Sequence, residues 1–332
     1  MTTRCAVVGA GAWGTALADL LARAGHDVLL WAREQDVVES VNASHRNDRF
    51  LAGPLLAPSL RATSDLAEAV EGADVVTYVA PSHVLRQVLR AHAAAVPSSA
   101  TLVVATKGIE RESLAIMTDV VAEELPGHQI VALSGPSFAA EVAARQPTAV
   151  VAAATNIAVA EQVQRVFSTD SFRVYAHDDV VGVELGGALK NVMAVATGMA
   201  EGLGLGFNSR AALITRGLAE MTRLGVAIGA RPSTFAGLAG MGDLVLTCTG
   251  SLSRNRSVGM EVGQGKTIAE VLAARETVAE GVTTARSAAE LARREGVEMP
   301  IVSAVERILF EGYPPRRAIE ELMGRELRPE QD

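Results

Sequence analysis

Short apolar runs alternate with helical stretches along the first half of the chain. The runs are rich in Val and Ala and are followed by turns, which is the pattern of buried strands; they cover residues 5–8, 28–31, 75–79, 102–105, 130–133, 149–152 and 172–174. Helical periodicity lies between most of them, most clearly at residues 13–24, 84–95 and 114–124. Strands and helices that alternate in this way predict a parallel, doubly wound sheet.

The pattern changes near Asp178. From there on the strand signal stops, and helical periodicity covers residues 180–200, 209–225, 279–294, 301–310 and 316–323. A chain of 332 residues is long enough for about two domains. We therefore predict an α/β protein with an N-terminal sheet domain over residues 1–178 and an all-α C-terminal domain over residues 179–332. Only the polar tail RELRPEQD is expected to fray.

The composition fits a globular α/β protein and argues against several other classes. Hydrophobic residues make up 49% and charged ones 20%, and the apolar residues are mostly Ala, Val and Leu, which suit helices packed on a parallel sheet. The net charge of -8 argues against nucleic acid or an anionic membrane as a partner of the whole chain. The longest uncharged runs, residues 91–106 and 146–160, are shorter than the ~18 residues of a spanning helix, so we expect no stable membrane insertion.

Cysteine and histidine usage bears on the cellular location and on metal binding. Cys5 and Cys248 are too few for a disulfide framework, which indicates a reducing, cytoplasmic location. The start RCAVVGAGAWG reads as a strand and a glycine turn and not as a secretory signal. The six histidines are scattered without the spacing of metal ligands, so we expect no metal site.

A glycine-rich turn follows the first predicted strand. In VVGAGAWGTALADLL, Gly9, Gly11 and Gly14 form G-x-G-x-x-G at the opening of a helix. The first glycine permits a tight turn, the second lets the backbone approach a pyrophosphate, and the third lets helix and strand pack closely. The helix N-terminus adds free N–H groups. The context predicts a Rossmann-type dinucleotide site, with a tight turn that binds nothing as the alternative.

The end of the second strand bears on which dinucleotide is bound. An NAD site usually has Asp or Glu there for the ribose hydroxyls, whereas this chain reads Ala32-Arg33-Glu34. Arg33 suits the 2′-phosphate of NADP, although two solvated surface charges fit the same pattern. We therefore expect NADP or NAD. Trp13 either covers the cofactor or packs in the core.

Polar residues follow several predicted strands. Ser82 and Lys107 stand where two strands end, and ligands of open parallel sheets gather at that edge. Gly135 and Ser137 lie in SGPSFAAEV ahead of a helix, where backbone N–H and hydroxyl groups can reach a substrate. An ordinary strand-to-helix turn is the alternative for the loop with Gly135 and Ser137, and a surface lysine is the alternative for Lys107.

The second half contains GMGDLVLTCTGSLSRNRSVG. Asp243 follows a glycine-rich turn, and Ser253 is a predicted helix cap followed by Arg254 and Asn255. A guanidinium and an amide at the start of a helix make a good phosphate receptor, because the paired N–H donors of the guanidinium and the positive end of the helix dipole both attract the phosphate. A solvated charged loop is the alternative.

One apolar helix is interrupted by a charge. GVELGGALKNVMAVATGMAEG carries Lys190 and Asn191 directly after a Gly186-Gly187 pair and two apolar residues. An ammonium in such a segment points to a proton donor or acceptor in a site. The alternative is a lysine on an exposed face, or one that extends its charge to water along its own stem.

Taken in chain order, these segments resemble the bacterial NAD(P)-dependent glycerol-3-phosphate dehydrogenase family, over nearly the whole chain. The segments that carry the resemblance are GAGAWGTALA, APSH, ATKGIE, SGPSFAAEV, LGGALKNVMAVATGM, NSRAALITRGLAEM, GMGDLVLTCTGSLSRNR and VAEGVTTA. The LKN and SRNR segments are far more specific than the glycine loop. The resemblance implies reversible NAD(P)H-dependent reduction of dihydroxyacetone phosphate to sn-glycerol 3-phosphate for glycerophospholipid synthesis.

The resemblance also assigns residues. Lys190 is the proton donor or acceptor in this assignment, while the nicotinamide exchanges hydride with the carbonyl carbon. The substrate contacts are Lys107, Gly135, Ser137, Lys190, Asn191, Asp243, Ser253, Arg254 and Asn255. The cofactor contacts are Gly9, Gly11, Ala12, Trp13, Gly14, Arg33, Lys107, Ala139, Arg254, Val278 and Glu280. Ala12 departs from the family, which often has a hydroxyl there, so only its backbone is left for the pyrophosphate.

Several points stay open from the sequence. Burial and Lys107 would lower the pKa of Lys190, whereas Asp243 would raise it, and the balance is not fixed. A dehydrogenase for a hydroxy acid or sugar acid, and a redox sensor that binds dinucleotide without catalysis, are the competing functions. The sequence is also compatible with a homodimer formed through the helical half.

Overall fold

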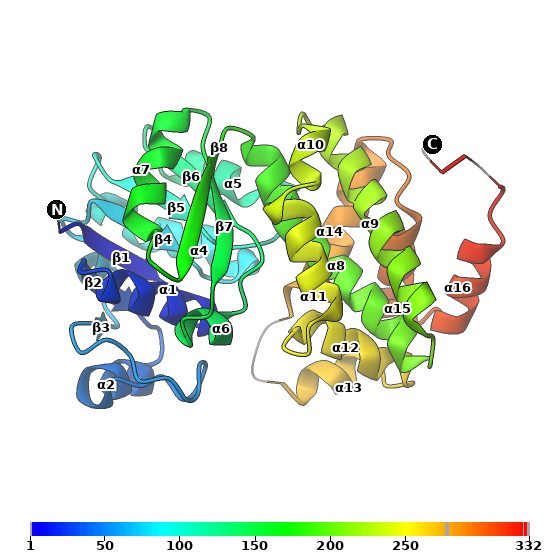
Figure 1. Ribbon diagram of the computed structural model, residues 1–332, viewed down its shortest axis with the longest axis horizontal. Helices are drawn as coiled ribbons and strands as arrows, with labels where there is room; N and C mark the ends of the chain where they lie inside the picture. Colours follow the sequence, from blue (N-terminus) through cyan, green and yellow to red (C-terminus); the bar gives the residue numbers. More distant parts are fainter. Residues whose placement is uncertain (1, 276–278, 328, 331–332) are drawn as a thin grey trace.

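The computed structural model describes residues 2–275, 279–327 and 329–330, and its sheet half and helical half lie side by side (Figure 1). The cofactor contact expected at Val278 and part of the polar tail lie outside the described residues. The sheet has eight strands in the order β3-β2-β1-β4-β5-β6-β7-β8. The strands are β1 (Arg4–Val8), β2 (Asp27–Trp31), β3 (Arg61–Thr63), β4 (Val75–Tyr78), β5 (Thr101–Val104), β6 (Gln129–Ser134), β7 (Thr148–Ala153) and β8 (Phe172–His177).

The predicted fold class is confirmed, with one difference in the direction of two strands. Strands β1 to β6 pair in parallel, but β7 pairs with β6 antiparallel, and β8 runs parallel to β7. The only helix between β6 and β7 in this described stretch is α6 (Ala139–Ala143). A five-residue helix spans about 7.5 Å and cannot return the chain along the ~20 Å of a strand. The chain therefore turns back at the carboxyl end of β6.

The central strands β1, β4 and β5 are largely apolar because both faces of the sheet are covered. In β1, Cys5 and Val7 belong to one core layer, while Ala6 and Val8 belong to the other. Helices α1 and α7 pack on the first layer, and α4 and α5 on the second. The helices of this half are α1 (Ala12–Arg23), α2 (Gln35–Ser44), α3 (Leu66–Val70), α4 (Ser82–His92), η1 (Ala93–Ala95), α5 (Met117–Glu124), α6 and α7 (Ile157–Phe167).

The helical half is built around α8 (Val180–Gly202). This helix is long and apolar enough to cross a membrane, but 89% of its most apolar window is buried inside the protein, so it is the core helix of this half. The other helices are α9 (Phe207–Ala227), α10 (Pro232–Phe235), the π-helical turn η2 (Leu238–Gly242), α11 (Asp243–Thr249), α12 (Arg254–Gly263), α13 (Ile268–Ala273), α14 (Glu280–Arg294), α15 (Pro300–Glu311) and α16 (Pro315–Met323). The predicted division at Asp178 falls between β8 and α8.

Glycines let α8 and α12 cross at close range. A methyl group on Gly198 would lie 2.0 Å from the Arg256 carbonyl oxygen, and one on Gly259 would lie 2.0 Å from that of Val195. The crossing fixes the start of α12 relative to α8. It therefore fixes the distance between the two most specific sequence segments, LKN and SRNR.

One predicted helix begins later than expected. The periodicity placed its start at Leu114, but α5 begins at Met117. Leu114 has a left-handed backbone with φ of 59°, and Ile116 forms a β-bridge with Ile109. Residues 107–116 are therefore a folded-back loop between β5 and α5.

Candidate functional site

In the glycine turn after β1, Gly9 and Gly14 are enclosed by neighbouring backbone, whereas Gly11 faces open space. Gly9 has a φ of +123°, and a methyl group there would lie 3.0 Å from the Ala80 backbone nitrogen, while one on Gly14 would lie 1.8 Å from the Gly9 carbonyl oxygen. A methyl group on Gly11 would meet no described atom within 4 Å. Gly11 is also the N-cap of α1, whose first turn is capped by none of the described side chains. Open space beside free N–H groups fits the pyrophosphate of a dinucleotide.

A buried asparagine, which we did not predict, holds this turn. The Asn47 side-chain nitrogen donates to the Ala10 carbonyl oxygen at 2.9 Å and to Thr15 Oγ1 at 2.8 Å. Thr15 Oγ1 donates to the same carbonyl oxygen at 3.1 Å. Asn47 lies 33 positions beyond Gly14 in an irregular segment, so the sequence contains no local signal for the contact.

The residues expected around the cofactor ribose and rings occupy the same edge of the sheet. Arg33 follows β2 with 80% of its side chain exposed, and its guanidinium contacts only Glu34 among the described side chains, at 2.8 Å. Trp13 Nε1 is buried and has no hydrogen-bond partner in the described part of the chain. Ala12, Trp13 and Ala139 all pack against the core layer beneath α1.

Two lysines from different halves of the chain meet on one carboxylate. Asp243, the first residue of α11, is fully buried. Its Oδ1 accepts a hydrogen bond from Lys190 Nζ at 2.5 Å, and its Oδ2 accepts one from Lys107 Nζ at 2.8 Å. Lys107 Nζ also donates to the Gly135 carbonyl oxygen at 3.4 Å, and Ser137 Oγ donates to that oxygen at 3.0 Å. The structure thus brings five predicted substrate contacts together.

Lys190 is buried because α8 is enclosed on every side. Only 7% of the residue is exposed, so it neither lies on an exposed face nor extends to water. The glycine pair before it permits this enclosure. A methyl group on Gly186 would lie 2.3 Å from the Ala239 carbonyl oxygen, and one on Gly187 would lie 2.4 Å from Ser134 Oγ.

Burial decides the ionisation of this group of charges. It lowers the pKa of the Lys190 amine to about 7, against the attraction of Asp243 and with help from Lys107. For Asp243, burial acts to raise the pKa, but Lys107 and Lys190 outweigh it and the net pKa is lowered. The carboxylate is therefore ionised near neutral pH, while the Lys190 amine gains and loses its proton there. In the balance that the sequence left open, burial thus outweighs the attraction of Asp243.

A second polar group lies at the start of α12. Asn255 donates from its side-chain nitrogen to Asn191 Oδ1 at 2.8 Å and accepts from the Gly281 backbone N–H at 2.9 Å. Ser253 Oγ accepts from the Arg256 backbone N–H at 3.2 Å, which confirms the predicted helix cap. The side chain of Arg254, the first residue of α12, makes no hydrogen bond or ion pair with another described residue.

The neighbouring arginine is engaged elsewhere. Arg256 Nε and Nη2 donate to the two carboxylate oxygens of Glu201 at 2.9 and 2.7 Å. Of the two guanidiniums in SRNR, Arg254 is thus the one available to an incoming anion. Among residues 2–275, 279–327 and 329–330, no group of three or more His, Cys, Asp or Glu side chains could hold a metal ion.

A third contact joins the two halves near the glycine turn. Ser82 Oγ donates to Glu280 Oε2 at 2.6 Å, and the Ser82 backbone N–H donates to Glu280 Oε1 at 3.2 Å. Burial raises the pKa of Glu280, against the hydrogen bonds from Ser82. Ser82 was predicted to stand at the ligand-binding edge of the sheet, but its pairing with Glu280 was not.

Two family models match the chain. Residues 4–160 match the N-terminus and residues 179–320 the C-terminus of NAD-dependent glycerol-3-phosphate dehydrogenase. The chain belongs to the NAD-dependent glycerol-3-phosphate dehydrogenase family. The resemblance carried by the sequence motifs is thereby confirmed.

Relatives of this family match the chain from end to end. Glycerol-3-phosphate dehydrogenase (NAD(P)+) from Geobacter sulfurreducens is 58% identical over 333 residues, with 99% of both chains covered. The protein of the same name from Citrifermentans bemidjiense is 56% identical over 333 residues, with the same coverage. The crystal structure of glycerol-3-phosphate dehydrogenase from Coxiella burnetii is 41% identical, has a TM-score of 0.94, and covers 98% of this chain and 99% of its own.

Proposed function

We propose that the protein catalyses the reversible NAD(P)H-dependent reduction of dihydroxyacetone phosphate to sn-glycerol 3-phosphate, and so supplies glycerophospholipid synthesis. The observation that carries the proposal is a buried amine, Lys190 Nζ, 2.5 Å from the carboxylate of Asp243 that it shares with Lys107. Membership of the family supports the same reaction. A redox sensor without catalysis has no use for such an amine.

The residues at the edge of the sheet fit a dinucleotide, either NADP or NAD. The turn at Gly9, Gly11 and Gly14, with the backbone of Ala12, would hold the pyrophosphate, and Arg33 would lie near the ribose. The remaining proposed contacts are Trp13, Lys107, Ala139, Arg254, Val278 and Glu280. When bound, the nicotinamide exchanges hydride with the carbonyl carbon.

Lys190 is the general acid and general base of the proposed reaction. As an ammonium it donates to the oxygen of the reduced ketone, and as a neutral amine it accepts the hydroxyl proton in the reverse direction. A pKa of about 7 keeps both forms populated near neutrality. Asp243 orients the amine, and Lys107 places a second positive charge beside the oxygen, where negative charge develops.

The start of α12 would bind the phosphate group of the substrate. Arg254 supplies a free guanidinium, Asn255 an amide, and the helix N-terminus its dipole. Asn191 and Ser253 hold Asn255 and the helix start in place. The reacting carbon then lies at a fixed distance from its charged anchor, which is how positioning accelerates a reaction.

The decisive experiment is a steady-state assay with dihydroxyacetone phosphate and either NADPH or NADH. The wild-type protein should consume the reduced cofactor only when the ketone is present. Lys190→Ala should lower kcat about 10³-fold, because it removes the proton donor. Lys266→Ala is the control, since 56% of that side chain is exposed and its one ion pair among the described residues is with Glu261. A Lys190→Ala variant that is folded and keeps most of the wild-type kcat would rule out the role of Lys190.

We also propose that the protein is a cytoplasmic homodimer formed through its helical half, with a domain boundary near residue 178. Support for the dimer comes from α9, where Phe207 and Val226 are 81% and 47% exposed. Sedimentation velocity should give twice the chain mass of 34.6 kDa.

Limited proteolysis tests the proposed domain boundary. It should cut near Asp178, and cuts elsewhere would contradict that boundary.

A further inference from the structure

The segment that carries Lys107 is short and is fixed at its first end. Residues 107–116, which we call the Lys107 loop, connect β5 to α5. Thr106 immediately precedes it and is held at the end of β4, since its backbone N–H donates to the Tyr78 carbonyl oxygen at 3.1 Å and its Oγ1 to the Ala80 carbonyl oxygen at 2.8 Å. Gly108 has a φ of +156°, and a methyl group there would lie 2.6 Å from Ser82 Cβ. The backbone on both sides of Lys107 is thus tightly enclosed.

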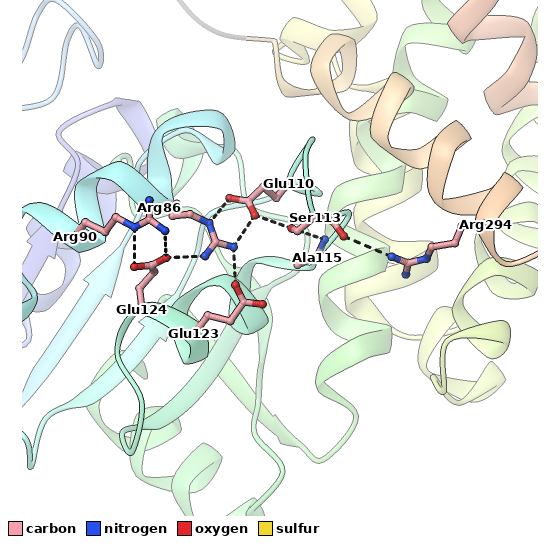
Figure 2. A network of polar contacts seen from close by, with 8 residues as sticks. All are labelled: Arg86, Arg90, Glu110, Ser113, Ala115, Glu123, Glu124 and Arg294. Atoms are coloured by element: carbon pink, nitrogen blue, oxygen red, sulfur yellow. Dashed lines mark hydrogen bonds and ion pairs between the residues drawn. The ribbon is translucent and has the colours of Figure 1, made fainter.

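A buried carboxylate fixes the loop again three residues later. Glu110 is 8% exposed. Figure 2 shows its carboxylate facing the guanidinium of Arg86 on α4, with Nε 2.8 Å from Oε1 and Nη2 2.6 Å from Oε2. Ser113 Oγ, from the far side of the loop, donates to Oε2 at 2.6 Å. The two-pronged contact with Arg86 specifies both the distance and the plane of the carboxylate.

Arg86 is itself held in position from α5. Its Nη1 donates to Glu124 Oε1 at 2.6 Å, and its Nη2 lies 2.7 Å from Glu123 Oε2 (Figure 2). Arg90 donates to the same Glu124 from Nε and Nη2, at 2.9 and 2.8 Å. Hydrogen bonding to Arg86, which outweighs burial, lowers the pKa of Glu110, so this carboxylate is ionised at neutral pH. The guanidinium is therefore a rigid anchor and not a mobile surface charge.

The other side of the loop faces the helical half. Ile109 and Ile116 are buried in the same apolar cluster as Leu185 and Leu189 of α8. Arg294 of α14 also reaches across, with Nη1 3.5 Å from the Ser113 carbonyl oxygen (Figure 2). Apolar packing of this kind resists separation but tolerates sliding, because it is not directional. The directional contacts of Glu110 are what fix the loop along its length.

We propose that Glu110, held by Arg86, is a positioning residue for Lys107: it keeps the Lys107 amine between Gly135 and Asp243 and thereby sets the affinity for the phosphorylated ketone. This inference rests on the proposed function, because it assigns Lys107 to the substrate. Among the described residues, no hydrogen bond or ion pair joins the Glu110 side chain to a residue assigned to substrate or cofactor. It acts only through the three-residue span that separates it from Lys107.

The test is the Glu110→Gln variant, measured with each substrate in turn. The KM for dihydroxyacetone phosphate should rise about tenfold, while the KM for NADPH stays within about twofold, because Lys107 is one of many proposed cofactor contacts but one of the two amines proposed beside the reacting oxygen of the ketone. Calorimetry with sn-glycerol 3-phosphate should show a matching loss of affinity without turnover. Glu306→Gln is the matched control, since Glu306 forms the same two-pronged pair with Arg293 between α14 and α15, and its side chain is 12% exposed against 10% for Glu110.

A double-mutant cycle separates positioning from general destabilisation. In a Lys107→Ala background, Glu110→Gln should change the KM for the ketone by less than about twofold, because the residue it positions is gone. Equal rises in both KM values, or an undiminished effect in that background, would overturn the inference. If Glu110→Gln does not fold, Arg86→Lys is the second variant, because it keeps the positive charge but loses the two-pronged contact with Glu110. It should raise the KM for dihydroxyacetone phosphate by a smaller factor and again leave the KM for NADPH within about twofold. A wild-type protein inactive on the ketone would refute the proposed function, whereas an active one with an unaffected Glu110→Gln variant refutes this inference alone.

Discussion

At the residue scale, the amine of Lys190 links pH to the direction of the reaction. Its pKa is lowered by burial to about 7, so below that pH it is mainly charged and above it mainly neutral. Oxidation of sn-glycerol 3-phosphate needs the neutral amine, and its kcat/KM should rise with pH and level off above about 7. Reduction needs the ammonium, and its kcat/KM should fall above the same pH. Profiles in both directions, recorded with saturating cofactor, test this.

The neighbouring charges predict how that profile moves. Lys107 lowers the pKa of Lys190, and Asp243 raises it. Lys107→Ala should therefore shift both limbs to higher pH, because Asp243 then attracts the Lys190 proton without competition. Limbs that stay in place, or that move to lower pH, would contradict the arrangement of the three charges.

Arg33 carries a separate prediction about cofactor choice. Its side chain is 80% exposed and pairs with Glu34, a contact that is weak in water and easily exchanged for a phosphate. Arg33→Asp should raise the KM for NADPH about 10- to 100-fold, which corresponds to a lost charge-assisted hydrogen bond of about 1.5–3 kcal/mol. The KM for NADH should change little or improve, since aspartate suits the free ribose hydroxyls. Equal changes for both cofactors would mean that Arg33 does not meet the 2′-phosphate.

At the element scale, the crossing of α8 and α12 should be intolerant of a single methyl group. Gly198→Ala would place Cβ 2.0 Å from the Arg256 carbonyl oxygen, so the helices must separate. The free energy of unfolding should fall by about 1–3 kcal/mol, and the KM for sn-glycerol 3-phosphate should rise because the start of α12 moves. Urea unfolding and steady-state kinetics measure the two effects. Gly206→Ala, whose Cβ meets no described atom within 4 Å, should cost less than about 1 kcal/mol and leave KM unchanged.

Elements with a local signal were predictable, and elements defined by distant partners were not. The glycine turn, α1 and the long apolar α8 follow from runs of adjacent residues. By contrast, β3 is the three-residue segment Arg61–Thr63, with no apolar run of its own, and it exists because β2 offers it an edge. The reversal at β7 likewise depends on how the chain leaves β6, which periodicity does not record.

The same division applies to the site. Lys190, Asp243 and Arg254 stand in specific motifs, and the sequence identified them. Asn47 and Glu110 support the site from elsewhere, and their partners lie 32 and 24 positions away in the chain. A hydrogen bond of that separation leaves no periodic trace. Glu110 did stand in the quoted segment ATKGIE, so its proximity to Lys107 was visible, but its partner Arg86 was not.

At the scale of the whole molecule, three buried or half-buried polar links between described residues join the sheet half to the helical half, besides the exposed contacts of Arg231 with Asp178 and of Arg294 with Ser113. The three links are Lys107–Asp243, Ser82–Glu280 and Thr118–Glu184. The first two lie among the proposed ligand contacts, whereas the third does not. Glu184 on α8 accepts from the Thr118 backbone N–H at 3.1 and 3.2 Å and from Thr118 Oγ1 at 2.5 Å, and so caps the start of α5 from outside.

Glu184→Ala should therefore weaken the coupling between the halves as well as the fold. It leaves two buried donors of Thr118 without a partner, which costs about 1–3 kcal/mol. Both tryptophans, Trp13 and Trp31, are in the sheet half, so their fluorescence follows that half while far-UV circular dichroism follows all the helices. The two urea curves should coincide for the wild-type protein and separate for Glu184→Ala.

Glu220 offers the matched control, because it is another buried carboxylate that caps a helix from a neighbouring one. It accepts from the backbone N–H groups of Ile301 and Val302 at 2.8 and 3.3 Å, but all these residues belong to the helical half. Glu220→Ala should lower stability by a similar amount while the two curves still shift together. If Glu184→Ala behaves in the same way, the halves are joined sufficiently by the other polar contacts and by the packing of Ile109 and Ile116 against α8, and Glu184 is not needed to couple them.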